Sequence, residues 1–339
     1  MRNYVSLILA LGISQAQAQV VNEVSVYIKP GTEVHIFESL TNSNSGNLEV
    51  GEEALLYVDG VLSNNGTITF ENDASLMRGA NSTDGGSGTY QVKQSGYFGA
   101  GYNMWSSPVA ANSSVPGTVS YQYIEANGTQ FHGDDYPSDP GWASYNGTMT
   151  PGKGYAGSAA GNYTFSDNEA NNGTITIGLH QTPFDPSYTS VTGGTPFNLV
   201  GNPYPSGLDC QALVTAGANS GVHGSLYFWI DDGSAGGNYS ASDYAIWNLV
   251  GNVPNTANAN GSATPNGYMK TGQGFMIRNT NSANLTFNNA MRVTNTMANA
   301  FFRVNAEESR LWFSINGPTP AAFNQILVGV LDDATDGED

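Results

Sequence analysis

The chain has 339 residues, of which 42 are glycine, 15 are proline and only 11% are charged. Its 28 acidic residues outnumber its 10 basic ones, and the net charge of −18 would repel a phosphate backbone. The composition excludes nucleic acid as a partner and disfavours long helices, while a hydrophobic content of 39% can bury the cores of about two or three domains.

The N-terminus resembles an export signal. Arg2 precedes the apolar run "VSLILALGIS", and "AQA" at Ala16 to Ala18 has the small-x-small pattern of a signal-peptidase site. We therefore predict that residues 1–18 are a signal peptide and that the mature chain begins at Gln19. An uncleaved anchor is the alternative, but the run is shorter than the roughly 20 residues of a membrane span. The prediction is an exported protein, at the cell surface or extracellular, with no transmembrane segment after cleavage.

Residues 19–94 form a β-rich N-terminal region of short runs separated by Gly and Asn. In "TITF" and "ALLYVDG" apolar and polar residues alternate, as in a strand with one buried face. Such strand–turn units predict a β-solenoid-like or a β-sandwich segment, and the short loops favour the solenoid. The small polar residues of "GANSTDGGSGTY", at 79–90, predict an exposed linker or loop.

Beyond this region, three ordered motifs occur twice. "YNMWSSPV" parallels "FNLVGNPYPSGLDC", "TPGKGYAG" parallels "KTGQGFMI", and "NYTF" parallels "NLTF". In the first pair a strand meets prolines that cannot continue a ladder, so both motifs are predicted to be corners, with Trp105 as a core anchor. Two related β-sandwich domains are expected, at 95–195 and 196–310, the second with an insertion at about 228–265. Residues 311–339 would start a further β-segment with an acidic end, which makes the fold class all-β.

The amino-acid sequence from about Tyr102 to the end of the chain resembles those of large secreted and surface proteins of Bacteroidetes. The phrases that carry the resemblance include "YNMWSSPV", "PFNLVGNPYPSGLD", "LYFWIDDG", "GQGFMIRN" and "FNQILVGVLDDATDGED". It implies β-rich ectodomains at the outer membrane surface and export by type IX secretion. Such proteins usually end in a sorting domain. The sequence stops at Asp339 without one, so we expect a fragment of a longer polypeptide, or delivery by another route.

The catalytic motifs of common hydrolases are missing. There is no G-x-S-x-G, and the four histidines lack metal-binding spacing. "GKGYAG" lacks the Lys-Ser/Thr context of a phosphate loop and is interpreted as a turn. The lone cysteine, Cys210, cannot form an internal disulfide and is predicted to be a small buried residue rather than a nucleophile.

Calcium is the best candidate cofactor, because it takes hard oxygen ligands from acidic loops. The loops "HGDDYPSD", "WIDDGSAGG" and "LDDATDGED" qualify, although none has the spacing of an EF-hand. A solvated acidic tail is the alternative for the third loop. The candidate metal ligands are Asp231, Asp232, Asp332, Asp333, Asp336 and Asp339.

Aromatic residues near some of these carboxylates could stack on sugars. Tyr136, Trp142 and Trp229 are the candidate ligand-binding residues, and the alternative is that such rings fill β-sheet cores. Two functions follow. The first is a non-catalytic adhesion or structural spacer module whose partners are surface glycans or other surface proteins. The second is a secreted carbohydrate-active enzyme, or its accessory binding region, whose paired carboxylates sequence alone does not exclude.

Overall fold

The computed structural model describes most of the chain after the N-terminal segment. The described residues are 19–80, 82–95, 102–110, 113–125, 141–158, 162–180, 197–229, 243–253, 264–279 and 284–298, and the backbone of 310–316 and 323–329. They fall into two compact units, 1–303 and 304–339. The all-β prediction is confirmed, since α1 (Cys210–Thr215) is the one α-helix among the described residues.

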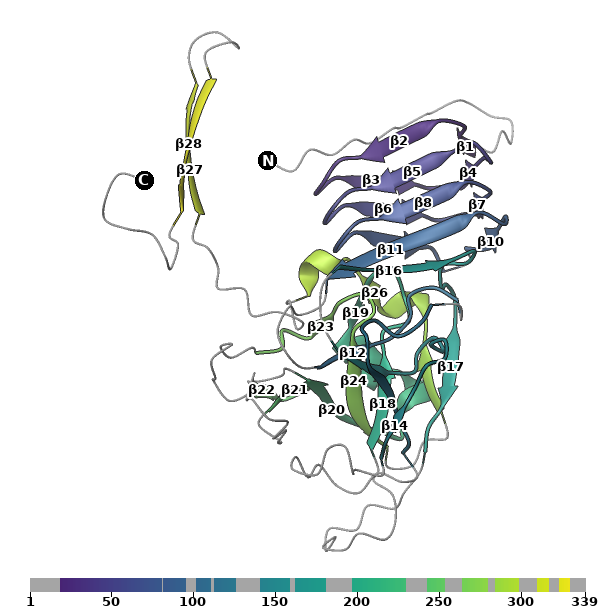
Figure 1. The fold of residues 1–339 in the computed structure, drawn as a ribbon, viewed down its shortest axis with the longest axis vertical. Coiled ribbons are helices and arrows are strands. Elements are labelled where there is room, and N and C mark those ends of the chain that lie inside the picture. The colour runs from purple at the N-terminus through teal and green to yellow at the C-terminus, as the bar shows by residue number, and fades with distance from the viewer. Residues whose placement is uncertain are drawn as a thin grey trace, which may run out of the picture. The chain divides into compact units, whose positions relative to one another are not determined.

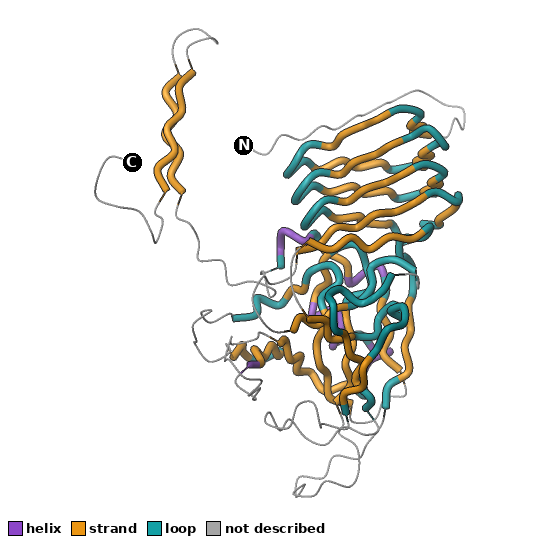
Figure 2. The backbone as a smooth tube through the Cα atoms, viewed as in Figure 1, coloured by secondary structure: helices purple, strands orange, loops and turns teal. Residues whose placement is uncertain are grey.

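The N-terminal region is a β-solenoid, which decides between the two predicted alternatives (Figures 1 and 2). Three parallel sheets share its coils, and equivalent residues such as Gln19 and Ser39, or Ser25 and Asn47, lie opposite one another 20 to 22 residues apart. Its strands are β1 (Gln19–Asn22), β2 (Ser25–Ile28), β3 (Glu33–Ile36), β4 (Ser39–Asn42), β5 (Asn47–Val50), β6 (Leu55–Val58), β7 (Leu62–Asn64), β8 (Thr67–Phe70), β9 (Ser75–Arg78), β10 (Asp84–Gly85) and β11 (Thr89–Ser95).

Stacked side chains hold the coils together. Apolar residues form columns, in which Val50 of one coil lies against Phe70 of the next, both fully buried. A polar column runs beside them: Asn22 donates to Asn42 at 2.8 Å, and Asn42 donates to Asn64 at 2.8 Å. Each buried amide thereby satisfies the next, as in the Asn ladders of other stacked strands.

The predicted linker at 79–90 is wrong. Within it, β10 pairs in parallel with β7, and β11 begins at Thr89 and pairs with β8. The small residues serve close coil packing instead. A Cβ at Gly88 would lie 2.3 Å from the carbonyl oxygen of Gly66, so no larger residue fits between these turns.

Strand pairing joins the solenoid to the rest of the first unit. β11 pairs in parallel with β8 on one side and antiparallel with β16 (Asn162–Asp167) on the other. In Figure 1, β2, β5, β8, β11 and β16 lie in this order along one sheet. We call the remainder of this unit, from Tyr102 to Ala298, the body.

The body contains two antiparallel sheets with the same strand order. The first follows β12-β15-β13-β14, and the second follows β18-β24-β20-β21 with β22 added at its edge. Their strands are β12 (Tyr102–Trp105), β13 (Ser120–Tyr123), β14 (Trp142–Ser144), β15 (Tyr155–Ser158), β18 (Phe197–Gly201), β20 (Val222–Trp229), β21 (Tyr244–Asn248), β22 (Gly251–Val253) and β24 (Gly274–Asn279).

The register is also shared, so the repeated motifs occupy equivalent positions. Trp105 lies opposite Tyr155 in the first sheet, as Val200 lies opposite Phe275 in the second. The motif "MWSSPV" thus matches "LVGNPY", each at the end of the first strand. Since β20 and β21 are the counterparts of β13 and β14, the extra residues of the second half lie in two places: between β18 and β20, where β19 (Gly207–Asp209) and α1 occur, and between β21 and β24, where β22 and β23 (Tyr268–Met269) occur.

The halves exchange equivalent contacts. The Ser106 N–H donates to the Gly272 carbonyl at 2.8 Å, and the Gly201 N–H donates to the Gly152 carbonyl at 2.9 Å. Gly272 and Gly152 are equivalent, and both have a positive φ that favours glycine. One antiparallel sheet per half is therefore described, joined by pseudo-twofold contacts. That each half is a sandwich domain of its own stays a prediction.

Three hydrophobic cores result. The first runs from the solenoid interior to Trp105, the predicted anchor, which is 1% exposed. The second lies under β18, β20 and β24 and contains α1 together with β17 (Ile175–Gly178) and β25 (Asn284–Phe287). The third combines residues of both body sheets, including Met104, Leu199 and Met276.

The remaining small elements close this unit: β19 pairs with β23 and with β26 (Arg292–Val293). The second unit contains an antiparallel hairpin of β27 (Arg310–Asn316) and β28 (Phe323–Gly329). No helix in the described part of the chain is long and apolar enough to span a bilayer.

Candidate functional site

Two predicted aromatic residues, Trp142 on β14 and Trp229 on β20, lie on strands that are not equivalent, but each pairs with a tyrosine on the neighbouring strand. Tyr123 and Trp142 lie opposite one another on β13 and β14, with ring centroids 5.2 Å apart in edge-to-face geometry. Trp229 and Tyr244 do the same on β20 and β21, at 5.1 Å. The two tryptophans thus belong to matching Tyr–Trp pairs, one in each half. The third predicted residue, Tyr136, lies outside the described residues.

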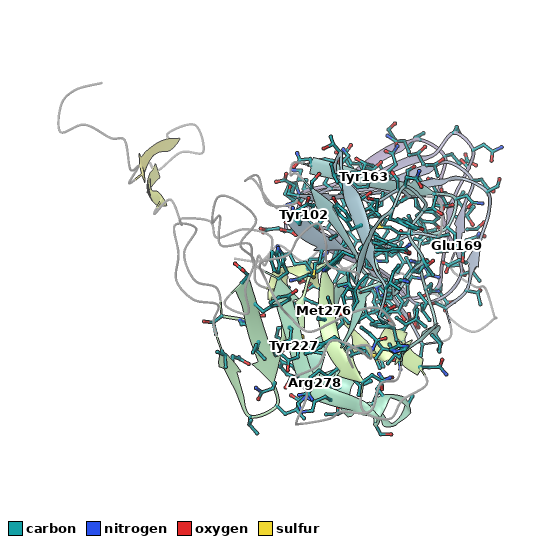
Figure 3. All side chains as sticks on the ribbon, turned by 60° about the horizontal axis from the view of Figure 1, so that its bottom comes forward. Tyr102, Tyr163, Glu169, Tyr227, Met276 and Arg278 are labelled. Atoms are coloured by element: carbon teal, nitrogen blue, oxygen red, sulfur yellow. The ribbon has the colours of Figure 1, made fainter. Side chains whose placement is uncertain are left out.

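These pairs pack at the border of the core that the two halves share. Tyr123 and Tyr244 are buried, whereas Trp142 and Trp229 are half-buried against them. The indole N–H of Trp229 donates to the Tyr102 carbonyl at 2.9 Å, which fixes the ring against the other half. Figure 3 labels Tyr102, with Tyr227 and Met276 on neighbouring strands of the second sheet. The rings therefore contribute to packing, and only part of each tryptophan is accessible.

The predicted calcium ligands all lie outside the described residues, both the Asp231 and Asp232 pair and the four aspartates of the C-terminal end. The first pair falls between β20 and β21, and "HGDDYPSD" falls between β13 and β14, so two of the acidic segments have equivalent places in the duplicated sheets. Within the ranges that the structure covers, no three His, Cys, Asp or Glu residues gather closely enough to hold a metal ion.

A hollow of about 300 Å³ lies where the halves meet. It brings Lys153 and Glu125 together with backbone of β17 and β18, and Lys153 forms a bridge to Val200. Glycoside hydrolysis requires two carboxyl groups, and Glu125 is the one carboxylate among the described residues that line this hollow.

The junction between solenoid and body contains an ion pair and several buried hydrogen bonds. Lys270 and Asp73 form an ion pair at 2.5 Å, with side chains 11% and 15% exposed. The Asn295 amide donates to the Ala74 carbonyl at 2.8 Å, and the Asn295 N–H donates to the Ser75 hydroxyl at 2.8 Å. The sequence did not predict the roles of these residues, because their partners are about 200 positions away and no local sequence pattern indicates the contacts.

Arg292 lies at the centre of this junction. Its guanidinium donates to the Leu76 carbonyl and to the Ser206 hydroxyl, the latter at 3.1 Å, and lies 4.8 Å over the Tyr204 ring. Burial lowers the pKa of Arg292 to about 9, with Tyr204 acting in the opposite direction, so the group remains charged at neutral pH. Burial raises the pKa of Tyr204 well above its usual value. A buried charge with several acceptors fixes the geometry of the elements that supply them.

Cys210 is a structural residue, as predicted. It is fully buried at the start of α1, whose N-cap Asp209 accepts from the N–H groups of Gln211 and Ala212. Burial raises the pKa of the Cys210 thiol, and the nearby Asp209 carboxylate raises it further. The thiolate that a nucleophile requires is therefore disfavoured.

The comparisons with known proteins give a family for the chain. A family model described as a domain of unknown function (DUF8693) matches residues 13–339. Since the match spans nearly the whole sequence, the chain belongs to this family. No curated protein and no solved structure matches it.

Proposed function

We propose that the protein is a non-catalytic, exported module of the cell surface that acts as an adhesion or spacer element. The observation that supports this most is the junction, in which β11 belongs to the last coil and pairs with β16 of the body. The ion pair of Lys270 with Asp73 and the hydrogen bonds of Arg292 and Asn295 add to it. A spacer must hold its ends at a fixed separation, and a junction of paired strands and buried polar contacts does so.

Spin labels can test this fixed geometry. Cysteines replace Val61, which lies in a solenoid turn, and Val250, which lies beyond β21; their side chains are 43% and 97% exposed. Cys210 stays unlabelled because it is buried. We measure the distance between the two labels by double electron–electron resonance, with the labelled protein diluted in unlabelled protein. We expect a single narrow distance distribution. A broad or two-component distribution would contradict the spacer proposal.

The proposal includes export by type IX secretion, supported by the signal-like N-terminus and by the resemblance to Bacteroidetes surface proteins. Protease treatment of intact cells should degrade the protein, and N-terminal sequencing of the surface fraction should give Gln19 first. A cytoplasmic protein that still begins at Met1 would contradict it.

The partner we propose is a surface glycan. It is supported by the partial exposure of Trp142 and Trp229, which belong to the matching Tyr–Trp pairs of the two halves, because aromatic faces stack on sugars. On a glycan array Trp142→Ala should lose binding, whereas Trp247→Phe, a change within the second core, should retain it. Equal binding by both variants would remove Trp142 from the site.

The second candidate function is a secreted carbohydrate-active enzyme or its accessory region. The hollow at Glu125 is the observation that favours it. Release of reducing ends from polysaccharides by the mature protein, abolished by Glu125→Gln, would establish this candidate and overturn the non-catalytic proposal. Binding without release is the result that we expect.

A further inference from the structure

The two ends of the solenoid are completed differently. At the end nearer the body, β16 pairs with β11. At the other end, β1, β2 and β3 each pair with a single strand of the next coil, and no second strand lies beside them in the described part of the chain. The first coil therefore presents three open strand edges, which are ready templates for pairing with another chain.

The same end exposes the apolar interior of the coil. Val20 lies opposite Leu40, and Val26 opposite Leu48, so each pair belongs to one inward-facing column. Leu40 and Leu48 are 2% and 4% exposed, whereas Val20 and Val26 are 40% and 41% exposed. Because the residues differ by one coil, the missing cover accounts for the exposure.

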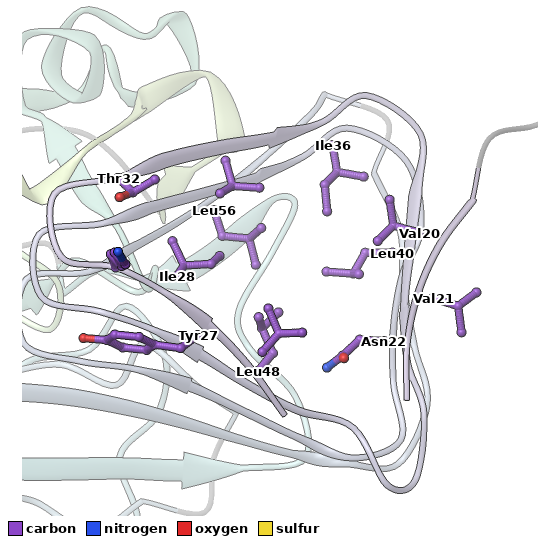
Figure 4. A pocket seen from close by; sticks show the side chains of 13 residues that line it. Val20, Val21, Asn22, Tyr27, Ile28, Thr32, Ile36, Leu40, Leu48 and Leu56 are labelled. Atoms are coloured by element: carbon purple, nitrogen blue, oxygen red, sulfur yellow. The ribbon is translucent and has the colours of Figure 1, made fainter. Parts of the chain in front are cut away.

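An apolar hollow of about 550 Å³ marks this end. Figure 4 shows Val20, Ile28 and Ile36 pointing into the interior of the coil, while Val21 points away from it. Exposed apolar surface that continues a core, bordered by open strand edges, is typical of an association site. Cleavage after Ala18, as the sequence predicts, removes the segment that precedes β1. That segment is then not available as a cover in the mature chain.

We propose that a second copy of this chain covers it, so that two solenoids associate through their first coils across a twofold axis. Such an axis sets equivalent strands antiparallel, and antiparallel edges can form regular ladders. Each copy then supplies the layer of apolar side chains that the other lacks.

The charge of the first coil fits this occupant. It carries Glu23, Glu33, Glu38 and Lys29, a net charge of −2, whereas the second coil carries Glu49, Glu52, Glu53 and Asp59 and no lysine or arginine. Lys29 forms no ion pair within the described residues, so it is available to a carboxylate of the other copy. For a chain with a net charge of −18, contact through this coil repels less than contact through the more acidic second coil would.

Sedimentation and light scattering of the chain beginning at Gln19, from about 1 to 100 μM, test the proposal. We expect a dimer for the wild type, and a folded monomer with an unchanged circular-dichroism spectrum for Val26→Lys, which places a charge at the contact. Val24→Lys, at a residue that is 64% exposed beside the same edge, is the second variant and should also be monomeric. Val250→Lys, which removes an exposed apolar side chain far along the sequence, is the matched control and should remain dimeric.

Two results would overturn the proposal. One is a monomeric wild type at the highest concentration. The other is a dimer that both Val24→Lys and Val26→Lys retain, which would place the contact elsewhere. If the wild type is monomeric and the first coil of the chain beginning at Met1 is protected from hydrogen exchange, residues 1–18 cover the first coil instead of a second copy.

Discussion

The solenoid and the body are built on two different kinds of repetition. In the solenoid, residues 20 to 22 positions apart stack in parallel, so every coil is supported by its sequence neighbours. In the body, one sheet occurs twice, and its copies are joined by reciprocal contacts between distant motifs, such as Ser106 with Gly272 and Gly201 with Gly152. A stack of coils leaves unpaired strand edges at whichever coil comes last, whereas the two body sheets contact each other reciprocally. The solenoid therefore needs a cap at each end, and the body supplies one.

Among the substitutions that test whether the two regions unfold together, we expect the largest loss of stability at the buried phenylalanines of each region. Phe70 in the solenoid and Phe275 in the body are fully buried, and truncation of such a side chain to Ala costs about 3–5 kcal/mol. We expect Phe70→Ala and Phe275→Ala each to lower the midpoint of one shared transition in urea. Two separate transitions, each sensitive to only one variant, would show that the regions unfold independently.

The junction gives the next largest effect. Lys270→Met leaves the Asp73 carboxylate, 15% exposed, without its cation, which should cost about 3 kcal/mol. Lys93→Met is the control, because its pair with Glu71 has a similar distance, 2.6 Å, but lies at the surface with side chains 37% and 23% exposed. An exposed pair contributes about 1 kcal/mol or less. Equal destabilisation of the two variants in denaturant titrations would argue against a special role for the junction.

The asparagine column should give a smaller effect that is specific to the solenoid. Asn42→Ala removes the donor to Asn64 and the acceptor for Asn22, and buried groups that lose their partners cost about 1–3 kcal/mol. Asn47→Ala, at an exposed position of the same coil, should change the stability little. The column has no structural role if the two variants melt alike.

The smallest effect that we expect is stabilisation by calcium, which would bind only at the acidic segments. Binding at ten times Kd would stabilise the folded state by about 1.4 kcal/mol. We expect a rise in melting temperature in calcium over magnesium, lost in Asp231→Asn/Asp232→Asn if that loop holds the ion, or in a chain ending before Leu331 if the tail does. No rise above the magnesium control would leave these aspartates as solvated surface.

Part of this architecture was predictable from the sequence because its causes are local. The alternation in "TITF" and the Asn-Gly turns predicted short strands in a solenoid-like segment, and the repeated aromatic-Asn-apolar motifs predicted equivalent strands, β12 and β18. Trp105 was correctly predicted as an anchor. The linker prediction at 79–90 was wrong because small polar residues serve tight coil packing as well as they serve flexible loops.

The candidate site was less predictable, because its geometry depends on long-range contacts. Trp142 and Trp229 are conspicuous in sequence, but only the strand pairing shows that each forms a pair with a tyrosine, with the two residue types exchanged between the halves, and that both pairs pack at one core. The Arg292 and Lys270 contacts join residues about 200 positions apart, and charged residues are normally expected at the surface. Nothing local distinguishes them from ordinary surface charges.

The central claim, that solenoid and body form one coupled unit, is tested most directly by labelling a buried thiol in each. Cys210 probes the body, and Val58→Cys, at a fully buried solenoid position, probes the solenoid within the same chain. In native buffer we predict that both thiols react at the same rate, at least about 10³-fold slower than in the unfolded chain, because both are exposed only by global opening. Reaction of Val58→Cys well ahead of Cys210 would contradict the account, since it would show the solenoid opening on its own.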